Sequence, residues 1–134
     1  DEERSSIMER ELIGQLYNDI EYMNHRNLTI NFLSSTLIIE CPWRIEIKEQ
    51  MYAGSGDFVH VGMDKMLQKL DQVLAYQKIM SVKYDRMKGD LIVYFSGNMK
   101  LLVYPDSYLY ENWQWKMRNQ MLVSQAGGEV TTFT

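Results

Sequence analysis

The sequence predicts an α+β fold: a curved, mainly antiparallel sheet of six or seven strands with an N-terminal helix and one further helix. The first observation comes from residues 79–116, where short runs of alternating apolar and polar residues are separated by turn residues such as Gly89 and Gly97. The second is the helical spacing of apolar residues in two segments, at the N-terminus and from Asp64 onward. With 134 residues, of which 46% are hydrophobic, the chain can bury one core, and we expect a single domain over residues 1–134.

The first segment has the pattern of an acidic amphipathic helix over residues 1–24. Ser6 followed by Glu9 has the spacing of a capping box. Apolar residues then recur at helical intervals: Met8, Leu12, Leu16, Ile20 and Met23. Residues 1–24 hold seven acidic residues against two basic ones, whereas residues 25–134 hold eleven against twelve. We expect this helix to dock its apolar stripe on the sheet of its own chain or, alternatively, on a partner.

Residues 28–134 are predicted to form a β-rich body. Apolar residues alternate with polar ones over residues 28–32, which predicts a strand, and a longer alternation covers residues 37–47. Proline cannot donate to a strand ladder, so we expect the longer strand to bend or to lie at an edge at Pro42. Residues 51–61 contain a Gly-Ser-Gly run and are predicted to form a loop.

A second helix is predicted near residues 64–75, with Asp64 as its N-cap. The meander of residues 79–116 follows, and its fourth strand is the aromatic run over residues 108–116. Two further short strands are expected on either side of a turn at Gly127. The expected core comprises Leu37, Ile39, Trp43, Ile45, Leu70, Leu91, Val93, Phe95, Leu101, Val103 and Trp113.

Composition removes several classes of function. The net charge is −4 and the excess acidity lies in residues 1–24, so the body is not a basic nucleic-acid binder and we expect no nucleic-acid partner. No apolar run approaches the roughly 20 residues of a membrane helix, and we expect no membrane partner. A single cysteine, Cys41, cannot form an internal disulfide, which favours a cytoplasmic location.

Catalytic and metal-binding candidates are sparse. Asp57, His60 and Asp64 are close in sequence, but one histidine and two carboxylates are too few convergent ligands, and we expect no metal. Cys41 and His60 could be paired as nucleophile and base. However, the alternating pattern places Cys41 on a buried face beside Trp43, where a lone cysteine usually serves packing. We therefore expect no enzyme activity and no cofactor.

The aromatic residues near the end of the meander allow two interpretations. Five of them fall within twelve positions: Tyr104, Tyr108, Tyr110, Trp113 and Trp115. Alternation cannot bury them all on one face of a strand. If Leu109, Trp113 and Trp115 face the core, then Tyr108 and Tyr110 face outward. The tyrosines would then be either the edge of a thick aromatic core or a patch that binds another protein.

Several motifs occur together in the β-rich body: Trp43, Gly54 to Asp57, Gly89 to Phe95, Leu101 to Asp106, Tyr110 to Trp113, and Gly127 to Glu129. With these motifs, residues 36–130 resemble a family of short bacterial β-rich domains, some of which are similar to immunity proteins encoded beside polymorphic toxins. The resemblance implies a non-enzymatic protein that neutralises a toxin by binding it directly, with the cognate toxin as its partner.

The sequence thus favours a protein-binding module. The first candidate surface is the tyrosine segment with its flanking carboxylates: Asp106, Tyr108, Tyr110 and Glu111. The second is the acidic face of the N-terminal segment: Glu9, Glu11, Asp19 and Glu21. The alternative function is the binding of a small molecule in an aromatic pocket, for which the candidates are Trp43, Tyr104 and Trp115.

Overall fold

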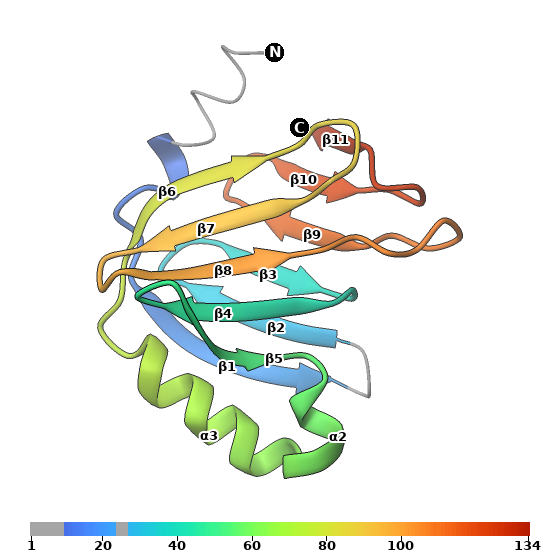
Figure 1. Ribbon diagram of the computed structural model, residues 1–134. Coiled ribbons are helices and arrows are strands. Elements are labelled where there is room, and N and C mark those ends of the chain that lie inside the picture. The colour runs from blue at the N-terminus through green and yellow to red at the C-terminus, as the bar shows by residue number, and fades with distance from the viewer. Residues whose placement is uncertain (1–9, 24–26) are drawn as a thin grey trace.

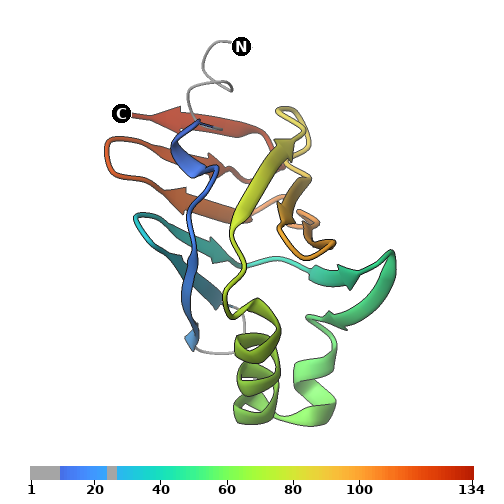
Figure 2. The same cartoon turned by 90° about the vertical axis from the view of Figure 1, so that its left-hand side faces the viewer.

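Two antiparallel sheets face each other across the core in the computed structural model, which describes residues 10–23 and 27–134 (Figures 1 and 2). The six-stranded sheet has the order β1 (Tyr17–Met23), β2 (Asn27–Phe32), β3 (Thr36–Ile39), β9 (Trp113–Lys116), β10 (Met121–Ser124) and β11 (Val130–Phe133). The five-stranded sheet has the order β5 (Gln50–Gly54), β4 (Trp43–Ile47), β8 (Met99–Val103), β7 (Leu91–Phe95) and β6 (Ile79–Tyr84). The two helices that lie wholly within the described residues are α2 (Asp57–Val61) and α3 (Met63–Leu74).

The α+β class and the mainly antiparallel pairing are confirmed, but the prediction of one sheet with six or seven strands is wrong. The long strand predicted over residues 37–47 is two strands in two different sheets, β3 and β4, and the chain crosses between the sheets at residues 40–42. The apolar alternation continues through the crossing because both sheets turn their apolar faces toward the same core. Of the two alternatives expected at Pro42, the structure has the bend, which lies between the two sheets, and not the edge position.

Within the part of the segment that the structure describes, the helix predicted over residues 1–24 is wrong from residue 13 onward. Only residues 10–12 are helical, and Gly14, with a φ of +89°, ends that turn. The chain then enters β1, which pairs with β2. Helical and strand periods can share positions over short stretches, and here backbone pairing with β2 decides the outcome. The capping pair Ser6 and Glu9 lies outside the described residues.

Three further elements differ from the sequence prediction. Residues 51–61 contain most of β5 and all of α2, so the predicted loop is wrong. The helix near residues 64–75 is confirmed as α3, but Asp64 lies in its first turn and Gly62 is its N-cap. The strands β6, β7 and β8 form the predicted meander. The fourth strand is shorter than predicted and belongs to the other sheet, because β9 pairs with β3 and β10.

The helix α3 closes the open side of the sandwich between the edge strands β1 and β5 (Figure 1). Its Asp71 carboxylate accepts a hydrogen bond from the Tyr17 hydroxyl of β1, and its Lys69 Nζ donates one to the Tyr52 carbonyl of β5. On its inner face it buries Met66, Leu70 and Leu74. All residues of the predicted core are buried.

A close backbone approach joins the two sheets on the opposite side. Gly89 precedes β7 and Gly128 precedes β11, and both have a positive φ. A Cβ atom at Gly128 would lie 2.1 Å from the Lys88 carbonyl oxygen, so only glycine fits there. Nearby, the Val130 amide donates to the Arg86 carbonyl at 2.8 Å. These contacts fix one end of the sandwich, where the chain also crosses between the sheets.

Candidate functional site

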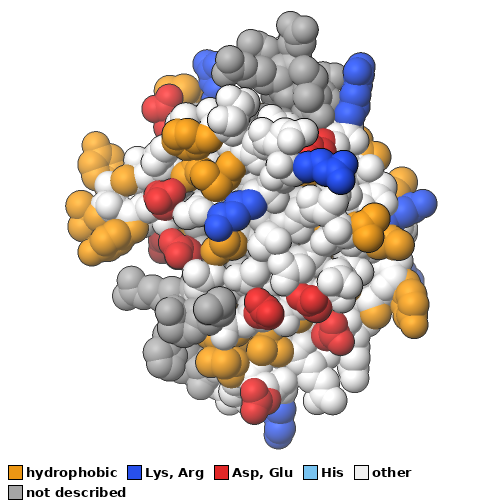
Figure 3. All heavy atoms as spheres, turned by 180° about the vertical axis from the view of Figure 1, so that it is seen from behind, with side chains coloured by type: hydrophobic (Ala, Val, Ile, Leu, Met, Phe, Trp, Pro, Cys, Tyr) orange, Lys and Arg blue, Asp and Glu red, His pale blue; other side chains and the backbone are white. Residues whose placement is uncertain are grey.

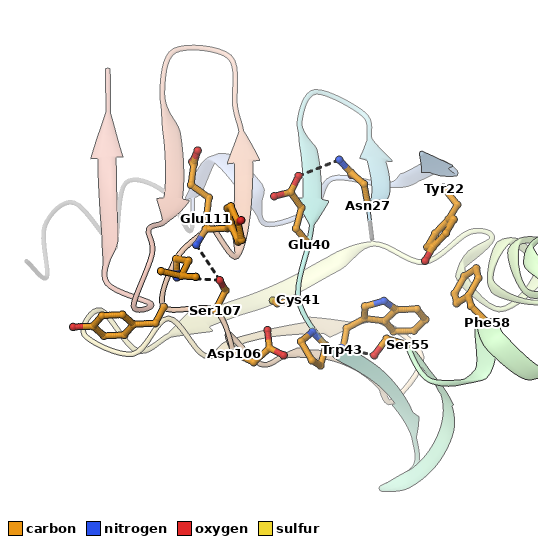
Figure 4. Close-up of a pocket in the computed structure, with 14 residues that line it drawn as sticks. Tyr22, Asn27, Glu40, Cys41, Trp43, Ser55, Phe58, Asp106, Ser107 and Glu111 are labelled. Carbon is orange, nitrogen blue, oxygen red and sulfur yellow. Dashed lines mark hydrogen bonds between the residues drawn. The ribbon is translucent and has the colours of Figure 1, made fainter. Parts of the chain in front are cut away.

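A groove of about 840 Å³ lies at this end of the sandwich (Figure 4). Its lining comes from the crossing segment between β3 and β4, from the segment between β8 and β9, and from β1, β2 and the region of α2. The described lining residues are Tyr22, Asn27, Glu40, Cys41, Pro42, Trp43, Ser55, Phe58, Asp106, Ser107, Tyr108, Leu109, Tyr110 and Glu111. The groove is thus built from segments that are far apart in the sequence.

Three aromatic rings form one end of the groove (Figure 4). The Tyr22 ring of β1 stacks on the Phe58 ring of α2, with centroids 4.4 Å apart and an interplanar angle of 12°. Trp43 of β4 meets Phe58 edge-on at 5.9 Å. Such pairs stabilise by about 0.5–1.5 kcal/mol beyond the area they bury. The three elements therefore hold this end of the groove in a defined shape.

A buried asparagine organises the opposite wall. The Asn112 side chain has 0% exposure and lies at the end of the segment between β8 and β9. Its Oδ1 accepts hydrogen bonds from the backbone amides of Asp106 (3.2 Å) and Ser107 (2.9 Å). Its Nδ2 donates to the carbonyl oxygens of Ser107 (3.2 Å) and Gln125 (3.1 Å). Asn112 thus uses both donor hydrogens and its acceptor to fix the wall to the β10–β11 turn.

The same segment carries an exposed tip, which we define as Tyr108, Leu109 and Tyr110. Ser107 Oγ accepts hydrogen bonds from the amides of Leu109 (3.2 Å) and Tyr110 (2.9 Å), so the tip is held as a turn. The three side chains are 85%, 78% and 66% exposed. In the space-filling view, hydrophobic side chains project from the edge of the molecule with acidic ones beside them (Figure 3). The tip is therefore an apolar surface on a fixed backbone.

The charged side chains among the described lining residues of the groove all have the same sign. Glu40, Asp106 and Glu111 contribute carboxylates, and none of the fourteen described lining residues is lysine, arginine or histidine. The Glu40 carboxylate accepts a hydrogen bond from the side-chain amide of Asn27 at 3.3 Å, and the Glu111 carboxylate accepts one from the side-chain amide of Gln114 at 3.4 Å. Within the described part of the chain, the ion pairs join Arg44, Glu46, Glu49 and Lys100, none of which lines the groove. Among the described residues, the Glu40 and Glu111 carboxylates of the groove therefore have neutral hydrogen-bond partners.

Cys41 lies in the groove with 8% of its surface exposed, as the alternation predicted. Burial raises the pKa of its thiol to about 12, and the carboxylates of Asp106, Glu40 and Asp90 contribute to the rise. At neutral pH the sulfur is therefore a protonated thiol, which is a poor nucleophile. The other partner considered, His60, lies exposed on α2.

We expect Cys41 to resist alkylation in the folded protein. With a pKa of about 12, its thiolate population at pH 8 is on the order of a thousandfold below that of an ordinary thiol, and its labelling by iodoacetamide should be slower by a similar factor. Mass spectrometry of the native protein measures this rate, and the urea-unfolded protein provides the reference. Labelling at the same rate in both states would show that the groove does not shield the thiol.

The structure brings the first predicted surface together and divides the second. Asp106, Tyr108, Tyr110 and Glu111 all line the groove. The strand predicted over residues 108–116 is wrong at residues 108–110, which form a turn, and Leu109, a candidate core residue of that strand, is therefore exposed beside the two tyrosines.

The second surface is not the face of a helix. Asp19 and Glu21 are exposed on β1, whereas Glu11 lies at the other end of the sandwich, where its carboxylate accepts hydrogen bonds from the Arg118 amide and the Gln120 side chain. Glu9 lies outside the described residues.

The aromatic pocket predicted from Trp43, Tyr104 and Trp115 does not form. Trp115 is fully buried, stacks on Phe32 at 5.8 Å and donates its indole hydrogen to Ser35 Oγ. Tyr104 lies under the Arg44 guanidinium, 5.2 Å from the ring centroid. Only Trp43 lines the groove.

Sequence reasoning missed the partners of Trp43 in the groove, Tyr22 and Phe58, because they come from segments predicted to be a helix and a loop. It also missed Asn112. An isolated asparagine before an aromatic strand gives no pattern from which four side-chain hydrogen bonds could be predicted.

Comparisons of the chain with protein-family models, with curated proteins and with solved structures give no match. Within residues 10–23 and 27–134, no helix is long and apolar enough to span a membrane. In the same part of the chain, no group of three or more histidine, cysteine, aspartate or glutamate residues is placed to hold a metal ion.

Proposed function

We propose that this protein is a non-enzymatic binding module that holds a protein partner with its groove and tip. The observation that carries the proposal is the tip itself: Tyr108, Leu109 and Tyr110 are exposed on a turn that Ser107 and Asn112 fix. Tyrosine is enriched at the energetic centres of protein interfaces. A backbone that is already ordered loses little conformational entropy on binding, which favours affinity.

The outward direction of the tip favours a macromolecular partner. A small ligand in the groove would leave most of the tyrosine surface in water, whereas the surface of a second protein can cover the tip and enter the groove at once. The polar contributions come from Asp106 and Glu111 on either side of the tip. Charges at such rims raise association rates and select among partners more than they add affinity.

The narrower proposal is that the partner is a bacterial toxin and the protein its cytoplasmic immunity protein. It rests on the resemblance of residues 36–130, which include the tip, the crossing segment and most of the groove. Co-purification of the tagged protein with the product of a neighbouring gene from the native host tests this proposal. Capture of a partner with no toxic activity when it is expressed alone would contradict it.

The second candidate function is the binding of a small molecule at the aromatic end of the groove. The stacked rings of Tyr22 and Phe58 beside Trp43 favour it, and a volume of about 840 Å³ falls within the range of small-molecule sites. This function does not require the tip, so substitutions in the tip distinguish the two candidates.

We expect the double substitution Tyr108→Ser and Tyr110→Ser to weaken partner binding by more than about 2 kcal/mol, or roughly thirtyfold in Kd. The melting temperature should remain nearly unchanged, because both side chains are exposed. Isothermal titration calorimetry with the co-purified partner and a thermal melt provide the two readings.

The matched control is Tyr76→Ser. Tyr76 is 93% exposed and follows α3 at the other end of the sandwich, where the chain pairs with residues 14–17. Its replacement should leave partner binding unchanged. Full binding by the tip variant, with a lowered melting temperature, would show that the tyrosines serve stability and would refute the proposal.

A further inference from the structure

Two chemically different parts of the groove lie next to each other. The Glu40 and Asp106 side chains lie on either side of Cys41, and the rings of Trp43, Tyr22 and Phe58 follow along the groove (Figure 4). The contribution of both carboxylates to the raised pKa of Cys41 indicates that their fields converge on the groove. An occupant of the groove thus meets negative charge and aromatic surface together.

The sign of the charge selects the occupant. No described basic side chain lines the groove, and within the described residues the Glu40 carboxylate accepts a hydrogen bond from the neutral side-chain amide of Asn27. A concave surface whose described lining carries carboxylates and no cation concentrates cations and repels anions. An acidic segment, a phosphate group or a nucleic acid would therefore be disfavoured. A metal ion is also disfavoured, since the described residues offer no group of three suitable ligands.

Among cationic groups, the geometry favours a guanidinium. Arginine combines a planar cation, which stacks on aromatic rings, with a fork of donors that matches a carboxylate. Its apolar stem can cover ring surface while its head reaches a charge. Tyr22 and Phe58 stack on each other, so the ring surface for the arginine is the part of Phe58 and Trp43 that lines the groove, and Glu40 and Asp106 provide the carboxylates. A lysine head would use the charge but not the planar stacking.

We propose that the groove receives an arginine side chain that the partner presents beside the surface that covers the tip. This inference rests on the proposed function, because the arginine belongs to the same protein partner. It specifies how the partner is recognised: the tip makes apolar contacts, and the groove binds one positively charged, planar side chain. The partner surface must then pair an arginine with an adjacent apolar patch.

The experiment uses three peptides that differ at one residue. The probe is Ac-Leu-Xaa-Gly-Leu-NH2 with arginine, lysine or citrulline at Xaa, and citrulline retains the arginine shape without its charge. Titration into ¹⁵N-labelled protein is followed by NMR. The indole signals provide a reporter: Trp43 lines the groove, while Trp113 and Trp115 donate to Gly89 and Ser35 in the core.

We expect the arginine peptide to shift the Trp43 indole signal and the amide signals of Glu40, Cys41, Trp43 and residues 106–111. Its Kd should be at least tenfold lower than that of the citrulline peptide and severalfold lower than that of the lysine peptide. Raising the salt concentration should weaken its binding. Equal binding of the arginine and citrulline peptides, shifts confined to other regions, or no binding of any peptide would overturn the inference.

The single variants Glu40→Gln and Asp106→Asn should each raise the Kd of the arginine peptide severalfold and leave that of the citrulline peptide unchanged. The matched control is Glu49→Gln, which removes an exposed carboxylate from the β4–β5 turn at the other end of β4. It should have no effect on either peptide. Unchanged NMR spectra outside the groove show that each variant is folded.

The same variants, tested with the co-purified partner, separate this inference from the proposed function. One outcome is that the tip variant loses partner binding while Glu40→Gln and Asp106→Asn bind fully. That result would support the proposed function and refute the inference that the groove binds an arginine of the partner. Full binding by all of these variants would refute both. Weaker binding by both sets supports the two proposals together.

Discussion

Replacing Trp113 by alanine should lower the free energy of unfolding by about 3–5 kcal/mol, which is a large share of the roughly 5–15 kcal/mol of a typical domain. Trp113 has 0% exposure and its indole hydrogen bonds to the Gly89 carbonyl oxygen at 2.7 Å. Its ring also meets Tyr84 edge-on, with centroids 6.4 Å apart. The residue lies on β9 of one sheet and contacts the β6–β7 hairpin of the other. Its removal therefore leaves a cavity between the sheets and an orphaned carbonyl.

Urea denaturation followed by far-ultraviolet circular dichroism measures this loss, since the substitution also changes tryptophan fluorescence. The control Trp113→Phe keeps an aromatic ring but removes the indole donor, and it should cost about 1–3 kcal/mol. A loss below about 1 kcal/mol for Trp113→Ala would show that the two sheets repack around the site. It would contradict the assignment of Trp113 to the core between them.

Local sequence patterns were sufficient to predict strands that have one buried face. The alternation in β7 and β8 predicted both the strands and their pairing, and every residue of the predicted core is buried. The same signal could not distinguish one sheet from two. Residues 37–47 keep their alternation across the crossing at Pro42, because a change of sheet leaves the direction of the core unchanged.

The errors in the first segment have a different cause. Leu12 is buried but Leu16 is 47% exposed, so the apolar helical stripe predicted to contain both residues does not pack on the core as one face. The amide of Gly14 donates to the Ile79 carbonyl at 2.7 Å, and the Ile79 amide donates to the Gln15 carbonyl at 3.0 Å. These bonds join residues more than sixty positions apart. Local spacing cannot predict such a pairing, and the tertiary contact prevails over it.

In the candidate site, too, some features could be predicted from the sequence and others could not. Sequence reasoning could place Tyr108 and Tyr110 outward, because too many aromatic residues fall in one short segment for all to be buried. It could not place the groove beside them, since Glu40, Tyr22 and Phe58 reach it only through the arrangement of the two sheets. The exposure of side chains within one segment was thus predictable. The shape of the groove was not, because several segments form it.

Replacing Asn112 by alanine should reduce both stability and partner binding, because one side chain holds the wall of the groove and the base of the tip. The substitution removes four hydrogen bonds and leaves the backbone amides of Asp106 and Ser107 to find other partners, whereas the carbonyl oxygens of Ser107 and Gln125 keep the Gly127 and Gly128 amides as donors. We expect a loss of about 2–4 kcal/mol in the free energy of unfolding. Partner affinity should fall at least tenfold under conditions where the variant is fully folded, because the tip is no longer ordered before binding.

The variant Asn112→Asp separates the two halves of this arrangement. An ionised aspartate still accepts from the amides of Asp106 and Ser107, but it cannot donate to the carbonyls of Ser107 and Gln125. The tip should then keep its turn while its attachment to the β10–β11 turn weakens.

Hydrogen exchange measures both regions. The backbone amides of residues 107–110 should be better protected from exchange in Asn112→Asp than in Asn112→Ala. The backbone amides of residues 125–128 should exchange faster in both variants than in the unsubstituted protein. Partner affinity should follow the protection of the tip across the three proteins. An affinity that instead follows global stability, or stays unchanged when the tip loses protection, would show that a preordered tip is not the source of binding.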